Sequence, residues 1–207
     1  MIWRSCRSWV CALSAPPSRG VASSRRVPHE AGLEFYDRLI DEIIADGMVP
    51  VITMEHYDIP VHLLTEYGGF ANREVIRFFC RYARVLLERY GDRVPYWIVF
   101  NQVNLIPTVN FGSLGLVDDQ AEDMEELMYR AVHHQMVAAA QVRQMAKQIA
   151  PSTKIGTMMA DGTYYPATCR PRDIVLTMQK NRMQYFFTDV QLRGSYPGYA
   201  LRYFAEH

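Results

Sequence analysis

The chain has 207 residues, of which 49% are hydrophobic and 21% charged, and its 22 basic side chains balance its 22 acidic ones. This length is enough for one domain with a large buried core, and the hydrophobic fraction excludes an intrinsically disordered protein. Zero net charge removes the main basis for binding a nucleic-acid backbone, and no apolar run approaches the ~18 residues of a membrane span. The four cysteines form no CxxC pair, so we expect neither a disulfide framework nor a metal site, and we expect a cytoplasmic protein.

Residues 1–29 differ in composition from the rest of the chain, because they are rich in Arg and Ser and contain neither Asp nor Glu. Such a composition is typical of a transit peptide, whereas a secretory signal is less well supported because the apolar run at 9–13 is short. A third interpretation is that the segment is disordered or translated out of frame. We therefore divide the chain into a non-matching segment, 1–29, and a folded region, 30–207.

From residue 30 onward, helical and strand patterns alternate. Apolar side chains predict, in chain order, a helix at 31–46, a strand at 48–54, a helix at 72–90, a strand at 96–100, a helix at 122–149, a strand at 154–159 and a further helix within 173–182. Apolar strands separated by helices indicate an α/β fold with a parallel sheet, either a closed eight-fold barrel or an open doubly wound sheet. No Gly-rich phosphate motif follows a strand, which disfavours nucleotide binding.

Polar side chains gather directly after the predicted strands, at 55–58, 101–104 and 161–165. In parallel barrels the active site lies at the C-terminal ends of the strands. The pattern therefore predicts a face that binds a sugar or another metabolite.

Four segments, read in order, resemble glycoside hydrolase family 1. They are Glu-Ala-Gly-Leu-Glu-Phe-Tyr at 30–36, Val-Ile-Thr-Met-Glu-His-Tyr-Asp-Ile-Pro at 51–60, Tyr-Gly-Gly-Phe-Ala-Asn-Arg-Glu at 67–74 and Gly-Asp-Arg-Val-Pro-Tyr-Trp-Ile-Val-Phe-Asn at 91–101. Two later segments, at 164–169 and 185–190, resemble the bacterial 6-phospho-β-glucosidase branch. The resemblance covers about residues 30–207 and implies an incomplete (β/α)8 TIM barrel with roughly strands 3 to 5 and their helices. It also implies retaining hydrolysis of β-glucosides or 6-phospho-β-glucosides, with no cofactor.

The resemblance assigns roles to individual residues. Retaining members use one glutamate as acid/base and another as nucleophile, with the two carboxyls about 5 Å apart. Gln102 stands at the acid/base position, directly after Asn101, and an amide cannot deliver a proton near neutral pH. Asn101 is expected to contact the sugar 2-hydroxyl and His56 another ring hydroxyl. Tyr57, where members usually have Trp or Phe, is expected to pack beside the sugar.

Tyr164 and Tyr165 are expected to contribute partly to the core and partly to the pocket wall. The family's nucleophile segment, Ile-Thr-Glu-Asn-Gly, has no counterpart after Lys154, and its phosphate-binding Ser/Lys/Tyr cluster has none either. We therefore expect an inactive fragment whose ligand is a β-glucoside or 6-phospho-β-glucoside disaccharide. The alternative is a non-catalytic sugar-binding or partner protein. Neither nucleic acid nor membrane is an expected partner, but unpaired barrel edges should promote association.

The resemblance also gives the out-of-frame interpretation a specific form. The family's second strand typically reads Ala-Leu-Arg-Thr-Ser-Ile-Ala-Trp-Ser-Arg-Ile-Phe-Pro. Codons for residues 13–25, read one base early, can encode these residues in the same order. We therefore expect that residues 1 to about 28 are an out-of-frame translation of the second-strand region and that the native frame resumes near His29.

Overall fold

The computed structural model describes residues 8–12, 30–160 and 162–206. Its strands form one parallel sheet in the order β1-β2-β3-β4. The strands are β1 (Ser8–Ala12), β2 (Val49–Glu55), β3 (Tyr96–Phe100) and β4 (Lys154–Gly156). In this register Ile52 lies beside Trp97, and Ile98 lies beside Gly156. Because all three strand pairings are parallel, the C-terminal ends of the four strands lie at the same edge of the sheet.

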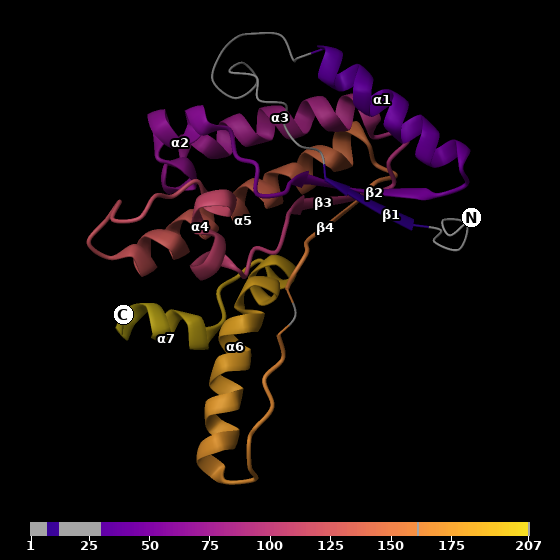
Figure 1. Ribbon diagram of the computed structural model, residues 1–207. Coiled ribbons are helices and arrows are strands. Elements are labelled where there is room, and N and C mark those ends of the chain that lie inside the picture. Colours follow the sequence, from indigo (N-terminus) through magenta and orange to yellow (C-terminus); the bar gives the residue numbers. More distant parts are fainter. Residues whose placement is uncertain (1–7, 13–29, 161, 207) are drawn as a thin grey trace.

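Helices connect the strands. Between β1 and β2 lies α1 (Glu30–Ala45), and β2 is followed by α2 (Val61–Tyr67), the 3-10 helix η2 (Gly69–Ala71) and α3 (Glu74–Tyr90). Between β3 and β4 lie α4 (Ile106–Leu114) and α5 (Met124–Ile149), and β4 is followed by α6 (Pro171–Arg193) and α7 (Gly198–Glu206). In Figure 1, α1 and α3 lie along one side of the sheet, whereas α6 and the extended segment before it form a hairpin that projects away from it.

The core lies between the sheet and the helices that cover it, chiefly α3 and α5. The ring of Phe79 in α3 stacks on Phe100 at the end of β3 with a centroid distance of 4.5 Å, and Phe70 meets Phe100 edge-on at 5.5 Å. Trp97 is also buried, with 1% of its surface exposed. Removing such large apolar side chains from water is the main contribution to folding, about 25 cal/mol for each Å² buried. This packing holds the end of β3 in place.

The predicted elements are confirmed, with differences mainly at their ends. The strand at 96–100 has the predicted bounds, whereas β4 stops at Gly156 and the chain then leaves the sheet. The last predicted helix is much longer than expected, since α6 spans Pro171–Arg193. The sequence did not predict α2, α4 or α7, and α4 contains Pro107 and Gly112, which weaken a helical pattern.

The structure adds a strand that the sequence did not predict. It is β1, which lies within the segment 1–29 and pairs with β2 along its whole length. Residues 13–25, on which the out-of-frame interpretation depends, lie outside the described residues.

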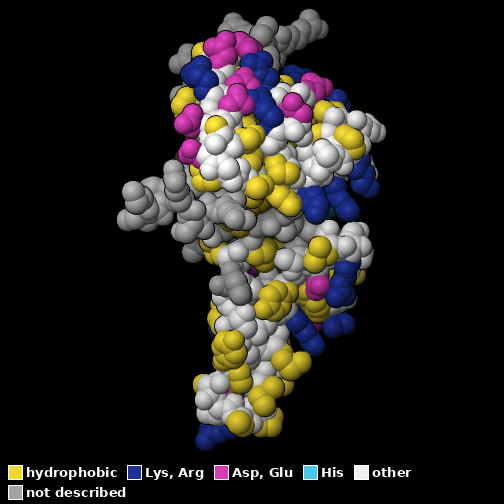
Figure 2. Space-filling view, turned by 90° about the vertical axis from the view of Figure 1, so that its right-hand side faces the viewer, with side chains coloured by type: hydrophobic (Ala, Val, Ile, Leu, Met, Phe, Trp, Pro, Cys, Tyr) yellow, Lys and Arg dark blue, Asp and Glu magenta, His cyan; other side chains and the backbone are white. Residues whose placement is uncertain are grey.

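Large apolar side chains remain exposed on α6, and in Figure 2 hydrophobic side chains are spread along the projecting hairpin. The exposed ones are Ile174, Val175, Leu176, Met178, Tyr185 and Leu192. Association of this chain with other molecules through such exposed apolar surfaces stays a prediction. None of the helices in the described ranges combines the length and the apolar character that a membrane span requires.

Candidate functional site

The ends of β2 and β3 bring together four of the residues singled out from the sequence. His56 and Tyr57 directly follow β2, and Asn101 and Gln102 directly follow β3. The backbone N–H of Asn101 donates to the carbonyl oxygen of Glu55 at 3.0 Å, so the ends of β2 and β3 stay side by side beyond the last residue of β3. The four side chains therefore belong to one polar cluster at the C-terminal edge of the sheet.

A hydrogen bond joins the two halves of this cluster. The hydroxyl of Tyr57 donates to Oε1 of Gln102 at 3.0 Å, and Nδ2 of Asn101 approaches the same oxygen at 3.4 Å. Tyr57 and Gln102 both have a positive φ, 65° and 39°. This backbone region is costly for residues other than glycine, and it is found at sites where surrounding structure holds the chain in place. Because of the hydrogen bond from Tyr57 and the nearby amide of Asn101, donors from within the protein occupy the amide oxygen of Gln102.

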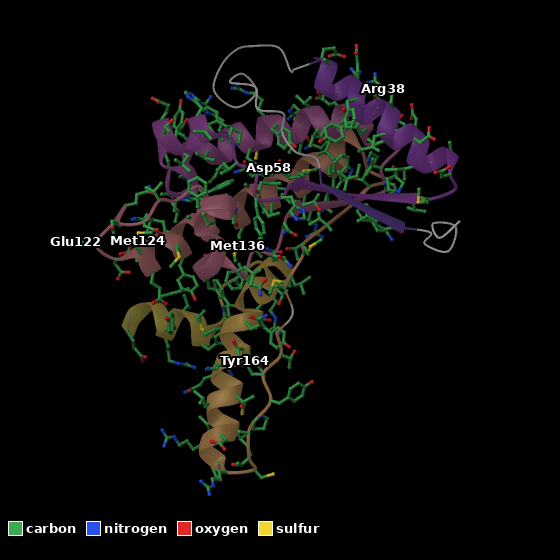
Figure 3. All side chains as sticks on the ribbon, in the orientation of Figure 1. Arg38, Asp58, Glu122, Met124, Met136 and Tyr164 are labelled. Carbon is green, nitrogen blue, oxygen red and sulfur yellow. The ribbon has the colours of Figure 1, made fainter. Side chains whose placement is uncertain are left out.

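The turn after β2 is held by a buried carboxyl. Oε1 of Glu55 accepts hydrogen bonds from the backbone N–H groups of Tyr57 at 2.7 Å and Asp58 at 3.3 Å. Figure 3 labels Asp58, whose own carboxylate accepts from the N–H of His56 at 3.1 Å. Burial, with a smaller contribution from the charge of Asp58, raises the pKa of Glu55 to about 8. Glu55 is therefore a mainly neutral acid at pH 7.

The position of Glu55 corrects one part of the sequence interpretation, which grouped residues 55–58 on the ligand-binding face. Glu55 instead lines a small apolar cavity of about 50 Å³ together with side chains of α2 and α3, among them Leu63 and Phe78. The reason is local, because the side chains of successive strand residues point to opposite faces of the sheet. Glu55 holds the turn that carries His56 and Tyr57.

Two polar atoms of the cluster have unused hydrogen-bonding capacity. Nδ1 of His56 and Oδ1 of Asn101 are buried and have no hydrogen-bond partner in the part of the chain that the structure describes. The ring of His56 meets the ring of Tyr57 edge-on, at a centroid distance of 5.7 Å. Leaving a buried polar atom unpaired costs about 1–3 kcal/mol, so such atoms are uncommon away from functional sites. The cluster is therefore suited to bind hydroxyl groups.

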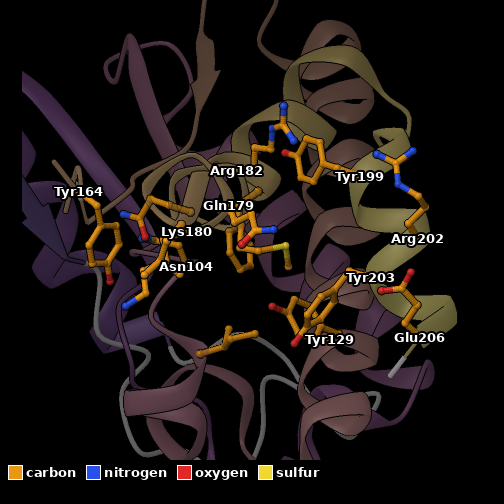
Figure 4. Close-up of a pocket in the computed structure, with 15 residues that line it drawn as sticks. Asn104, Tyr129, Tyr164, Gln179, Lys180, Arg182, Tyr199, Arg202, Tyr203 and Glu206 are labelled. Carbon is orange, nitrogen blue, oxygen red and sulfur yellow. The ribbon is translucent and has the colours of Figure 1, made fainter. Parts of the chain in front are cut away.

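The two candidate tyrosines lie on the projecting hairpin. Tyr164 lines a groove of about 700 Å³ that also includes Asn104, and Nζ of Lys180 lies 5.2 Å from the centroid of its ring. In Figure 4, Tyr164, Lys180 and Asn104 lie at one end of this groove and Glu206 at the other. Tyr165 is 84% exposed, so it does not belong to the core. The binding role of both tyrosines stays a prediction.

Sequence reasoning missed the role of Asn104. Its side-chain amide donates to the carbonyl oxygen of Ala160 at 2.8 Å and accepts from the N–H of the same residue at 2.9 Å. Gln184 of α6 donates to that carbonyl as well, at 2.6 Å. These contacts tie the loop after β3 to the segment after β4. The available signal was that Asn104 belongs to the polar run 101–104.

No group of three or more His, Cys, Asp or Glu side chains in 30–160 and 162–206 is arranged to hold a metal ion. The adjacent histidines of α5 have other partners: Nδ1 of His133 lies 2.7 Å from the hydroxyl of Tyr196, and Nδ1 of His134 lies 2.7 Å from the carbonyl oxygen of Phe70.

A parallel sheet of βα units with a polar cluster at the C-terminal edge is the arrangement expected for a segment of a (β/α)8 barrel. Residues 19–207 match the family model described as glycosyl hydrolase family 1. The chain belongs to this family.

Curated relatives support the narrower resemblance as well. The chain is 44% identical over 180 residues to the aryl-phospho-beta-D-glucosidase BglH of Bacillus subtilis, and 40% identical over 179 residues to the 6-phospho-beta-glucosidase AscB of Escherichia coli. These alignments cover 87% and 86% of this chain but 38% of each relative, so the chain spans less than half the length of the relatives it matches. The resemblance to bacterial 6-phospho-β-glucosidases is confirmed.

Solved structures confirm the incomplete barrel. The family 1 β-glucosidase from Thermotoga maritima superimposes with a TM-score of 0.82 at 30% sequence identity, covering 97% of this chain and 44% of that one. The β-glucosidase from Thermotoga maritima has also been solved in complex with glucoimidazole and in complex with deoxynojirimycin.

Proposed function

We propose that this chain is the part of a 6-phospho-β-glucosidase barrel that contacts the sugar and contains the acid/base position, and that it is catalytically impaired. One observation carries the proposal. Gln102 is the second residue after β3, next to Asn101 and within hydrogen-bonding distance of Tyr57, where family members have the acid/base glutamate.

The impairment follows from the chemistry of the amide. In retaining hydrolysis one carboxyl protonates the departing glycosidic oxygen while a second attacks the anomeric carbon. The amide of Gln102 can donate a hydrogen bond to that oxygen but cannot transfer a proton to it. General acid–base catalysis contributes about 10²–10⁴-fold, so its loss alone reduces turnover severely.

The ligand class rests on the site and on the relatives together. His56 and Asn101 offer buried polar atoms with unused hydrogen-bonding capacity, which suits sugar hydroxyls. The named activities of BglH and AscB favour a phosphorylated β-glucoside. A phosphorylated sugar does not cross membranes readily, and Cys80 and Cys169 are free thiols, so we place the protein in the cytoplasm.

A turnover assay with p-nitrophenyl 6-phospho-β-glucoside tests the proposal. We expect no release of nitrophenol above the solvent background. The matched variant Gln102→Glu returns a carboxyl to the acid/base position, so any turnover should be higher in this variant than in the unaltered chain. Measurable hydrolysis by the unaltered chain would contradict the impairment.

The alternative is a non-catalytic sugar-binding protein, and the ordered amide favours it, because Oε1 of Gln102 has two donors nearby. The two readings differ in binding. A functional binding protein must give saturable heat with a phosphorylated disaccharide at low ligand concentration, whereas the impaired glycosidase segment should give saturable heat only at much higher ligand concentration.

A further inference from the structure

The two departures of this chain from the family pattern contact each other. The resemblance places Trp or Phe where this chain has Tyr57, and glutamate where it has Gln102. The hydroxyl that distinguishes Tyr57 from phenylalanine is the group that donates to Oε1 of Gln102, at 3.0 Å. A hydroxyl that donates to a carboxylate stabilises its charged form and makes it a weaker acid. Beside the amide of Gln102 the same hydroxyl weakens no acid, because the amide does not transfer a proton.

Two neighbouring groups, the carboxyl of Glu55 and helix α4, hold Tyr57 in position. Its backbone N–H donates to Oε1 of the buried Glu55 at 2.7 Å, and its backbone adopts a φ of 65°. Helix α4 approaches closely, since a Cβ atom added at Gly112 would lie 3.2 Å from the Cβ of Tyr57. The side chain therefore reaches Gln102 from a fixed base.

The hydrogen bonds determine which end of the amide is available. Oε1 of Gln102 receives the hydroxyl of Tyr57 and lies 3.4 Å from Nδ2 of Asn101. Gln102 is only partly buried, and its Nε2 has no hydrogen-bond partner among the residues that the structure describes. The group presented outward is then an N–H donor.

We propose that Tyr57 is a positioning residue that orients the Gln102 amide so that Nε2 donates to the glycosidic oxygen of an intact β-glycoside. The inference rests on the proposed function, because it requires the sugar to bind beside Asn101. It deepens that function by naming the bond that the site recognises. A glycosidic oxygen accepts one hydrogen bond from Nε2 and keeps its bond to the anomeric carbon.

Two measurements test the role of Tyr57, and the first needs no ligand. In Gln102→Glu and in the double variant Gln102→Glu/Tyr57→Phe, carbon-13 NMR follows the titration of the carboxyl at position 102. We expect its acid dissociation constant to fall about tenfold when the Tyr57 hydroxyl is removed, because the hydroxyl favours the charged carboxylate. In the control double variant Gln102→Glu/Tyr185→Phe, the titration of the carboxyl at position 102 should be unchanged. The hydroxyl of Tyr185 forms a hydrogen bond with Thr163 on the hairpin instead.

The second measurement is calorimetric. Cellobiose phosphorylated on the 6-hydroxyl of its non-reducing glucose is titrated into the wild type, Tyr57→Phe and Tyr185→Phe. We expect Tyr57→Phe to bind this disaccharide about tenfold more weakly, with a smaller effect on glucose 6-phosphate, which has no glycosidic bond. Tyr185→Phe should match the wild type.

The outcomes separate the two proposals. Absence of saturable binding by the wild type would overturn the proposed function, and the inference with it, even if the titration shows the contact between residues 57 and 102. Saturable binding that Tyr57→Phe leaves unchanged, or a titration at position 102 that ignores the Tyr57 hydroxyl, would overturn the role of Tyr57 alone.

Discussion

The side chain of Asn104 forms two hydrogen bonds with the backbone of Ala160, donating at 2.8 Å and accepting at 2.9 Å. Asn104 follows β3 and Ala160 follows β4, so this pair joins neighbouring strands beyond the point where β4 leaves the sheet. The pair is the connection between the polar cluster around Gln102 and the hairpin that carries Tyr164.

We expect Asn104→Ala to destabilise the chain by about 1–3 kcal/mol, because it removes both hydrogen bonds of a buried side chain and leaves the N–H of Ala160 without its partner. Asn181 forms the same pair of bonds with the backbone of Tyr164, at 2.9 and 3.0 Å, but at an exposed position. Asn181→Ala should therefore cost less, about 0.5 kcal/mol, because water replaces the lost bonds. Urea unfolding measures both, and equal effects would contradict the structural role of Asn104.

A second prediction concerns the pH dependence of stability. The pKa of Glu55 is raised from 4.5 to about 8 in the folded chain. Between these values the folded state holds a proton that the unfolded state releases, so the contribution of Glu55 makes the free energy of unfolding fall as the pH rises. We expect Glu55→Gln, which resembles the neutral acid, to remove this part of the pH dependence.

The matched control for Glu55→Gln is Glu122→Gln, at an exposed position. It should leave the pH profile of the wild type unchanged. Urea unfolding at a series of pH values from 4.5 to 8 measures all three proteins. A Glu55→Gln profile that still falls as steeply as the wild type would contradict the burial of this carboxyl.

A third prediction concerns the ion pairs between α1 and α3. Asp37 accepts hydrogen bonds from Arg89 at 2.6 and 2.9 Å and a further short one from Arg93. The hydrogen bond from Arg89 is the main reason why the pKa of Asp37 lies below its ordinary value of 3.8. We expect Asp37→Asn to destabilise the chain by about 1 kcal/mol at neutral pH, since several charge-assisted bonds meet at one carboxylate.

The sign of the pH effect is opposite to that of Glu55. The contribution of Asp37 is present above the ordinary pKa of its carboxyl and is lost as the pH falls and the carboxyl is protonated. The difference between the wild type and Asp37→Asn should therefore vanish in acid and shrink at high salt. Asp92→Asn, at a carboxyl that is 80% exposed, should have almost no effect. Thermal unfolding at several pH values provides the comparison.

A fourth prediction concerns the reading frame of residues 1 to about 28. We propose that the coding DNA for residues 13–25, read one base early, encodes the second-strand sequence of family 1. Sequencing that DNA decides the matter directly. A stop codon or unrelated residues in the shifted frame would contradict it.

The sequence predicted the parts of the fold that depend on local pattern. The strand at 96–100 was placed correctly because Pro95 and Asn101 bound a continuous apolar run. Helix α4 was missed because Pro107 and Gly112 are poor helix formers and weaken the helical pattern of its sequence, although the helix itself is continuous and lies close to Tyr57. Such contacts come from distant segments and leave no periodic signal.

The site was predicted to a similar extent. Chain position alone places His56 and Gln102 at neighbouring strand ends, so their proximity could be expected. The bond between Tyr57 and Gln102 could not, because it depends on the positive φ angles of both residues and on the close approach of α4 to Tyr57.

The most direct test of a saccharide site at Gln102 is a calorimetric titration of the whole chain with 6-phosphorylated cellobiose. The sugars in the calorimeter cell are then analysed. We predict saturable heat, recovery of the intact disaccharide, and loss of the heat in His56→Ala. Release of glucose, or no heat at all from the wild type, would contradict the claim that Gln102 marks a saccharide site without an acid.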